Sequence, residues 1–218
     1  MAQLLTEYDF LPATKEDYDD FVYLGITEFI KIEPHAVAMG MTAPDARTLL
    51  EWLMGKCLHY PYSLKVVEKS TGQIVALNAV SLAHRDSKLD WEPFNLEAFP
   101  LPGCVQKLCG LFGKCSEQFW SLIDPKINKI VHQEVVFVLP DHQKKGIAKK
   151  MVTESFDEVR LRADGIEAIA SDAMSFANQT VLQKLGYQCI YEPEEHEWFA
   201  KIQDEAKGVK VMFKDIRK

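Results

Sequence analysis

The chain has 218 residues, a length within the range of one domain and sufficient for a substantial hydrophobic core. Its formal net charge of −7 argues against a nucleic-acid partner, which requires a concentrated basic surface, and mildly favours cationic substrates. No apolar run approaches membrane-spanning length and no signal-peptide pattern opens the chain, so we expect a cytoplasmic protein with no membrane partner. The five cysteines contain no C-x-x-C pair, which favours reduced packing cysteines over a metal site.

The N-terminal part of the chain predicts a short strand and two helices. Residues 8–11 form the strand, which Pro12 closes. Thr14 is the expected N-cap of a helix that ends near 32–35, because the residue before a proline is pushed out of the α region. Thr42 is the expected N-cap of the second helix, whose apolar face extends to Leu58.

A hairpin and an irregular stretch follow. Residues 63–68 and 74–80 predict two strands joined by a turn at 70–73. The pattern then changes between about 84 and 128, where an irregular segment precedes a helix over 104–122. No linker composition surrounds this stretch, so we interpret 1–218 as a single domain with an insertion at about 84–128.

A buried strand, a glycine turn and a helix come next. Residues 134–139 are almost continuously apolar and rich in β-branched side chains, and a proline ends them. Helical spacing continues over 144–163. The unpaired amides of the helix start lie beside Gly146 and the cations Lys144 and Lys145, a combination that suits a pyrophosphate. An ordinary strand–helix crossover with a solvated basic patch is the alternative.

The last part of the chain alternates strands and helices. The expected elements are a strand over 167–171, a helix over 176–185, a strand over 187–191, an acidic loop over 192–197 and a closing strand over 209–214. The strand–helix–strand passage from Glu134 to Ser171 implies a parallel crossover, whereas the flanking strands are antiparallel. The predicted fold class is therefore α/β (α+β), a mixed central sheet with helices on both faces.

The glycine turn carries a family resemblance. Its sequence QKKGIA, at 143–148, is similar to the Q/R-x-x-G-x-G/A signature of the GCN5-related N-acetyltransferase (GNAT) superfamily. The resemblance implies the acyl-CoA N-acyltransferase fold and acetyl-CoA as cosubstrate, with the pyrophosphate on the turn's amides and the pantetheine arm along the preceding strand. The cofactor-binding residues that it implies are Phe137, Val138, Gln143, Lys144, Lys145, Gly146, Ile147, Ala148 and Asn178.

The late helix and the Glu-Pro pair narrow the resemblance. The helix ends in K-L-G-Y, Lys184 to Tyr187, as in the superfamily, but Leu182 stands where many members have a tyrosine that protonates the CoA thiolate. Invertebrate arylalkylamine (dopamine) N-acetyltransferases make the same departure and share an apolar helix that ends in Glu-Pro, here Glu33 and Pro34.

The resemblance implies that Glu33 is the general base. An alkylammonium must lose a proton before its nitrogen can attack a thioester, and a partly buried carboxylate of raised pKa can accept it. The alternative is that Glu33 only caps or pairs at a helix end. Asn178 is a second candidate, either beside the pantetheine and thiolate or as a helix-entry residue, and Glu134 could hold a proton-carrying water.

We therefore expect an N-acetyltransferase that transfers an acetyl group from acetyl-CoA to the primary amine of a small arylalkylamine or polyamine, by direct attack on the thioester. The alternatives are a protein or peptide N-acetyltransferase and a non-catalytic acyl-CoA-binding protein with the same fold. The expected partner is a small-molecule amine, and the expected assembly is a monomer or weak dimer.

Overall fold

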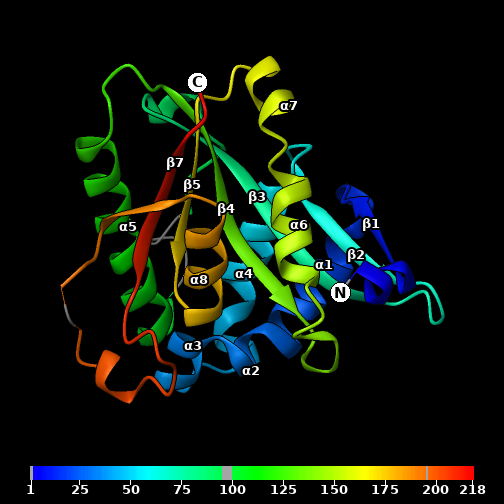
Figure 1. Ribbon diagram of the computed structural model, residues 1–218. Coiled ribbons are helices and arrows are strands. Elements are labelled where there is room, and N and C mark those ends of the chain that lie inside the picture. The colour runs from blue at the N-terminus through cyan, green and yellow to red at the C-terminus, as the bar shows by residue number, and fades with distance from the viewer. Residues whose placement is uncertain (1, 95–99, 195) are drawn as a thin grey trace.

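The computed structural model describes residues 2–94, 100–194 and 196–218, and in them seven strands form one sheet in the order β1-β2-β3-β4-β5-β7-β6 (Figure 1). The strands are β1 (Tyr8–Pro12), β2 (Leu64–Glu68), β3 (Ile74–His84), β4 (Lys129–Val138), β5 (Ala168–Ala173), β6 (Gln188–Tyr191) and β7 (Lys210–Asp215). Strands β4 and β5 run parallel, and the other neighbouring pairs are antiparallel. The expected mixed sheet is therefore confirmed.

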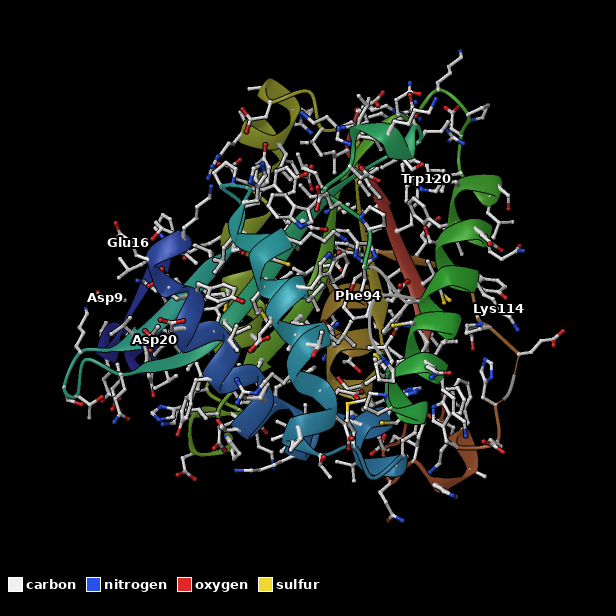
Figure 2. The ribbon with its side chains drawn as sticks, turned by 180° about the vertical axis from the view of Figure 1, so that it is seen from behind. Asp9, Glu16, Asp20, Phe94, Lys114 and Trp120 are labelled. Atoms are coloured by element: carbon white, nitrogen blue, oxygen red, sulfur yellow. The ribbon has the colours of Figure 1, made fainter. Side chains whose placement is uncertain are left out.

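Helices cover both faces of this sheet, as expected. The α-helices are α1 (Tyr18–Leu24), α2 (Ile30–Ile32), α3 (Pro34–Ala38), α4 (Ala43–Leu58), α5 (Gly103–Leu122), α6 (Ile147–Ser155), α7 (Glu158–Ala163) and α8 (Phe176–Lys184). A π-helical turn, η3 (Gly25–Phe29), joins α1 to α2, and the 3₁₀ turns are η1 (Ala2–Glu7), η2 (Lys15–Asp17), η4 (Ser87–Leu89), η5 (Pro140–His142) and η6 (Phe199–Lys201). Helices α6 and α8 lie on one face in Figure 1, and α4 and α5 lie on the face seen in Figure 2.

The alternation of side chains along β4 explains its continuous apolar run. Val135 and Phe137 pack into the cluster that contains α1 and α4, whereas Val138 packs with Ile147 and Met151 of α6. Both faces of the strand are thus buried, which removes the polar positions that a half-exposed strand would show. None of the helices in the described ranges is both long and apolar enough to cross a membrane.

The helix predicted over 144–163 is wrong in two respects. It begins at Ile147, because Lys144 (φ 60°) and Gly146 (φ 90°) have left-handed backbone conformations that a right-handed helix excludes. It also breaks after Ser155: Phe156 leaves the helical region, and the Asp157 carboxylate caps a second helix, α7.

The structure also revises the elements beside the site. Pro34, which the sequence placed at a helix end, is the first residue of α3, where its missing N–H costs nothing. Strand β5 extends to Ala173, two residues beyond the predicted end at Ser171. The insertion's helix is confirmed as α5. Residues 95–99 of the insertion and Glu195 of the acidic loop lie outside the described part of the chain.

Strands β4 and β5 separate in the middle of the sheet. They pair from Ile130 with Ala168 to Gln133 with Ser171, and within residues 129–173, all of them described, no β5 residue pairs with residues 134–138. At the same place the register of β4 against β3 shifts, so that Glu134 is an additional, bulged residue. A bulge redirects a side chain and bends its strand, and this one coincides with the parting of the strands.

Candidate active site

An open groove of about 620 Å³, which we call the turn groove, lies between the free edge of β4, the glycine turn and α8. Among the residues that the resemblance implied for acetyl-CoA, it is lined by Phe137, Val138, Gln143, Lys144, Gly146, Ile147, Ala148 and Asn178. Lys145 does not line the groove. Its ammonium donates a hydrogen bond to Tyr8 Oη (3.1 Å) on β1 and lies over the Tyr8 ring.

The turn presents unused hydrogen-bond donors. The amides of Gly146, Ile147 and Ala148 make no hydrogen bond within the described chain, and Lys150 N is the first amide to donate back, to Gly146 O at 3.1 Å. Gly146 is required by its positive φ, and a Cβ built there would meet no atom within 4 Å. Free amides at a helix start, with Lys144 and Lys149 beside them, are the donor set that binds a phosphate or pyrophosphate.

A second hollow of about 400 Å³, the aromatic cavity, lies between α4, α5 and the sheet. Its aromatic walls are Phe29, Trp52, Phe94, Phe112, Phe119 and Trp120. Figure 2 shows Phe94 between α4 and α5, and Trp120 on α5. The insertion thus forms one wall of this cavity.

The two hollows meet where β4 and β5 part. The residues common to both linings are Phe29, Glu33, Glu134, Val135, Asp172 and Met174. The carboxyl groups of Glu33, Glu134 and Asp172 therefore face the junction. The sequence brought forward only Glu33 and, as a fallback, Glu134.

Glu33 is a buried carboxyl group held by the start of α3. Its Oε1 accepts from His35 N at 3.0 Å and its Oε2 accepts from Ala36 N at 2.6 Å. Burial raises its pKa to about 7, the two amide hydrogen bonds opposing this shift and Asp204 adding to it. Glu33 therefore caps a helix, as one of the two alternatives expected, and the cap fixes a carboxyl group of near-neutral pKa at the junction.

The chain around residues 196–204 supports this cap from beneath. The His35 ring is buried, and its Nδ1 accepts from Trp198 Nε1 at 3.2 Å while the ring stands edge-on to Phe199. Burial lowers the pKa of His35 to about 4, so the ring is neutral at physiological pH. His35 is therefore a packing group that fixes the backbone from which Glu33 takes its hydrogen bonds.

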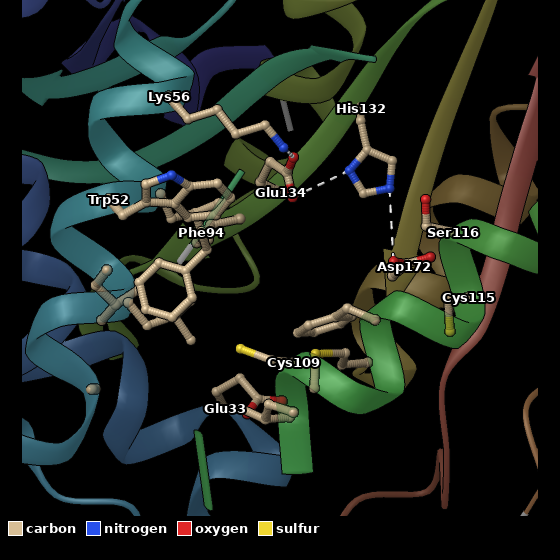
Figure 3. Close-up of a pocket in the computed structure, with 18 of the residues that line it drawn as sticks. Glu33, Trp52, Lys56, Phe94, Cys109, Cys115, Ser116, His132, Glu134 and Asp172 are labelled. Atoms are coloured by element: carbon tan, nitrogen blue, oxygen red, sulfur yellow. Dashed lines mark hydrogen bonds and ion pairs between the residues drawn. The ribbon is translucent and has the colours of Figure 1, made fainter. Parts of the chain in front are cut away.

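A network of charged and polar side chains forms the floor of the aromatic cavity (Figure 3). Lys56 Nζ and Ser81 Oγ donate to Glu134 Oε1 at 2.7 and 2.6 Å, and His132 Nδ1 lies 3.3 Å from Glu134 Oε2. On its other side, His132 Nε2 lies 3.8 Å from Asp172 Oδ2. This network joins side chains from α4, β3, β4 and β5, four segments that are far apart in the sequence.

The two carboxyl groups of this network, Glu134 and Asp172, have opposite pKa shifts. Burial opposes the charge of Glu134, but Lys56 and His132 overcome it and hold the pKa well below its usual range. Burial raises the pKa of Asp172 to about 6, and the more distant His132 offsets this only in part. The pKa of His132 is itself raised, because Glu134 outweighs the effect of burial. Glu134 is thus a fixed anion, which leaves Glu33 and Asp172 as the carboxyl groups that can exchange protons near neutral pH.

Asn178 belongs to a buried amide network. Its Nδ2 lies 3.5 Å from Gln133 Oε1, Ser171 Oγ donates to the same oxygen at 3.2 Å, and Gln133 Nε2 donates to Asn78 Oδ1 at 2.8 Å. Ser175 Oγ caps α8 by accepting from Asn178 N, the role that the sequence favoured for it. The network orients Asn178 beside the turn groove, while Asn178 Oδ1 has no partner in the described chain.

Leu182 lies in the core, without exposed surface, and packs with the residues of β5 and β7. It neither lines a hollow nor carries a proton. The groups that sequence reasoning missed are Lys56, His132 and Asp172. The available signal was the run His132-Gln133-Glu134, three polar residues in succession inside an otherwise buried strand.

The mixed sheet, with two parallel strands that part beside a glycine turn, has counterparts among solved structures. No family model and no curated protein matches the chain. Solved structures do. Arylalkylamine N-acetyltransferase 2 from Aedes aegypti aligns with 96% of this chain and 99% of its own length, at 20% identity and a TM-score of 0.75.

Two further structures show the range of the fold. A polyamine N-acetyltransferase from Drosophila melanogaster, an enzyme that forms N-acetylagmatine, aligns at 12% identity and a TM-score of 0.70 over 94% of this chain and 97% of its own. The C-terminal condensation domain of Ebony, in complex with β-alanyl-dopamine, aligns at 14% identity and a TM-score of 0.71 over 95% and 98%. The chain therefore has the GNAT fold that its turn motif predicted.

Proposed function

We propose that the protein is an acetyl-CoA-dependent N-acetyltransferase that acetylates the primary amine of a small arylalkylamine or polyamine. The position of Glu33 carries this proposal: a buried carboxyl group of near-neutral pKa lies where the turn groove meets the aromatic cavity. A protein that only bound acyl-CoA would need the groove but not this carboxyl group or the cavity.

The turn groove suits acetyl-CoA, which supplies an acyl group activated as a thioester. The amides of Gly146, Ile147 and Ala148 would hold the pyrophosphate, with Lys144 and Lys149 beside it. The free edge of β4 over residues 134–138 offers backbone donors and acceptors to an extended polar arm. Gln143 Nε2 donates to Val138 O at 3.0 Å and so fixes the turn relative to this edge.

Glu33 would take the proton of the incoming amine. An alkylammonium enters charged, and only its neutral form has the lone pair that attacks a carbonyl carbon. The carboxylate of Glu33 binds the ammonium and accepts its proton, directly or through water, while the amides of His35 and Ala36 keep the group aimed at the junction. General base catalysis of this kind contributes roughly 10²–10⁴-fold to the rate.

The aromatic cavity favours a small acceptor over a peptide. Its walls come from two helices and the sheet, and its volume of about 400 Å³ is in the range of small-molecule sites. Aromatic faces attract cationic groups, and the carboxylates at the junction strengthen that attraction. The solved structures of arylalkylamine and polyamine N-acetyltransferases with this fold favour the same acceptors.

A substrate panel tests the proposal. Release of CoA from acetyl-CoA is followed with tyramine, dopamine, tryptamine, serotonin, histamine and spermidine, and with peptides that present a free N-terminus or a lysine. We expect turnover with at least one small amine and none with the peptides. Turnover with peptides alone would establish the peptide alternative, and acetyl-CoA binding without turnover on any amine would establish the non-catalytic one.

A further inference from the structure

Asp172 is the least satisfied charged group at the junction. Its carboxylate makes no hydrogen bond with the described residues, and its nearest cationic atom is His132 Nε2, at 3.8 Å. Its side chain keeps 13% of its surface exposed. A carboxylate has about four acceptor sites. Those of Asp172 are open to the hollows that it lines.

The aromatic cavity as a whole carries more negative than positive groups. Its described lining contains the carboxyl groups of Glu33, Asp90, Glu134 and Asp172, against the cations Lys56 and His132. Lys56 is committed to Glu134 at 2.7 Å, and His132 lies closer to Glu134 than to Asp172. Glu134 thus holds both cations, and within the described ranges Glu33 and Asp172 lack a cation of their own.

Resting on the proposed function, we propose that Asp172 binds a second cationic group of the acceptor, so that the preferred substrates are primary amines that also carry an ammonium or guanidinium group. The reacting ammonium goes to Glu33, and the second cation goes to Asp172. Glu33 is the N-cap of α3 and Asp172 is a residue of β5, and Figure 3 shows the two carboxyl groups apart, with Asp172 on the side of His132.

The rigidity of the floor supports this role. Strand β5 holds Asp172 by pairing with Val211 of β7, and His132 sits between Asp172 and the fixed anion Glu134. The carboxylate is thus already in place before a ligand arrives. A cation that displaces water from such a site adds an interaction without the cost of ordering a side chain.

A simple structural ion pair with His132 would make a different prediction. Such a pair is complete without a ligand, so its loss would affect every acceptor in the same way. A ligand-binding Asp172 discriminates between acceptors with one and with two cationic groups, because only the second kind reaches it.

The experiment compares matched acceptors in the wild type and in Asp172→Asn. Putrescine, cadaverine and agmatine represent two cationic groups, and butylamine and phenethylamine represent one. We expect the wild type to have a higher kcat/KM for the first group. In Asp172→Asn, kcat/KM for these acceptors should fall by about 10-fold or more, chiefly through KM, because truncating one partner of a buried charge pair is costly. The values for butylamine and phenethylamine should stay within about 2-fold.

Two controls keep the comparison interpretable. Asp20→Asn removes the same charge from an exposed position on α1, outside both hollows, and should change neither group of acceptors. Asp172→Ser, a smaller replacement, repeats the test if Asp172→Asn does not fold.

The outcomes separate this inference from the function on which it rests. Turnover of amines with equal losses for both groups in Asp172→Asn, or with no loss for either, would overturn the role of Asp172 and leave the acetyltransferase intact. A wild type that prefers butylamine or phenethylamine would do the same. Absence of turnover with every amine, in a protein that binds acetyl-CoA, would overturn both. A selective loss with the acceptors of two cationic groups is the result that supports the inference.

Discussion

The turn groove and the aromatic cavity meet at one junction but are built from different kinds of groups. The groove takes its donors from consecutive backbone amides at Gly146, Ile147 and Ala148, and its shape from the edge of one strand. The cavity takes its groups from side chains on α3, α4, α5, β4 and β5, which are far apart in the sequence. One site is a property of a short segment, and the other is a property of the packing.

The difference extends to the electrostatics. At the glycine turn, the groove presents backbone donors and lysine side chains, and this part needs no group of perturbed pKa because amides do not titrate. The cavity presents carboxyl groups whose charge depends on their neighbours, with Glu33 near pKa 7 and Glu134 well below its usual range. In the proposed function, backbone amides would bind the cosubstrate, which is the same in every turnover, and side chains would bind the acceptor and take its proton.

The sharpest test of the cavity is Glu33→Gln. Loss of the basic site should lower kcat/KM by about 10²-fold or more near neutral pH. The wild-type kcat/KM should rise as the pH increases through about 7, the pKa of the group, because only the ionised carboxylate accepts a proton. The variant should lack this limb, and its deficit should shrink at high pH, where free amine is abundant.

A structural effect of the same substitution is distinguishable. Glutamine has one acceptor oxygen for the two amides of His35 and Ala36, so some loss of stability is expected. A displaced α3 would lower kcat/KM by the same factor at every pH, whereas a missing base would not. Wild-type kcat/KM across the pH range would exclude Glu33 as the base and move attention to Glu134.

Lys56→Met tests whether Glu134 destabilises the folded protein when its lysine partner is removed. It leaves Glu134, whose side chain is 14% exposed, with His132 and Ser81 as its partners among the described residues, and removing one partner of such a largely buried ion pair costs about 3 kcal/mol. Urea unfolding should show this loss at pH 7. Lys114→Met, on the exposed side of α5, is the matched control and should change stability little. Equal stabilities of the two variants would show that Glu134 finds other compensation.

Gly146→Glu tests the groove. A carboxylate at the start of α6 would face the pyrophosphate, and like-charge contact should weaken acetyl-CoA binding by roughly 10- to 100-fold in calorimetry. Gly72→Glu is the control, because Gly72 also has a positive φ (71°) and open space around it, at the tip of the β2–β3 hairpin. It imposes the same backbone strain and charge away from the groove. Unchanged affinity in a folded Gly146→Glu protein would place the ligand elsewhere.

Asn178→Ala should have the smallest effect. Its hydrogen bond to Gln133 is long, at 3.5 Å, and its Oδ1 is unpartnered in the described chain, so truncation should change the free energy of unfolding by less than about 1 kcal/mol. Acetyl-CoA affinity should fall by about 3-fold, the loss of one weak hydrogen bond. A fall of kcat/KM as large as that expected for Glu33→Gln would make Asn178 a catalytic group.

The sequence predicted most of the fold because its signals are local. Residues 134–138 of β4, the hairpin of β2 and β3, the caps of α4 and α8 and the helix α5 follow from periodicity and capping residues within each segment, whereas the first half of β4, from Lys129, was not predicted. The misjudged helix over 144–163 has a local cause as well. The backbone at Lys144 and the break at Phe156 oppose a periodic pattern that remains continuous in the sequence.

The sequence by itself determined the glycine turn, because consecutive residues build it, and the family resemblance of the Glu-Pro pair pointed to Glu33. Only the tertiary structure decided what surrounds them. Lys56, His132 and Asp172 meet in one network around Glu134. They do so because β4 parts from β5, because β4 bulges at Glu134, and because α4 and α5 approach the sheet there. The pKa of each carboxyl group depends on burial and on charges that lie dozens of residues away, and no local pattern contains that information.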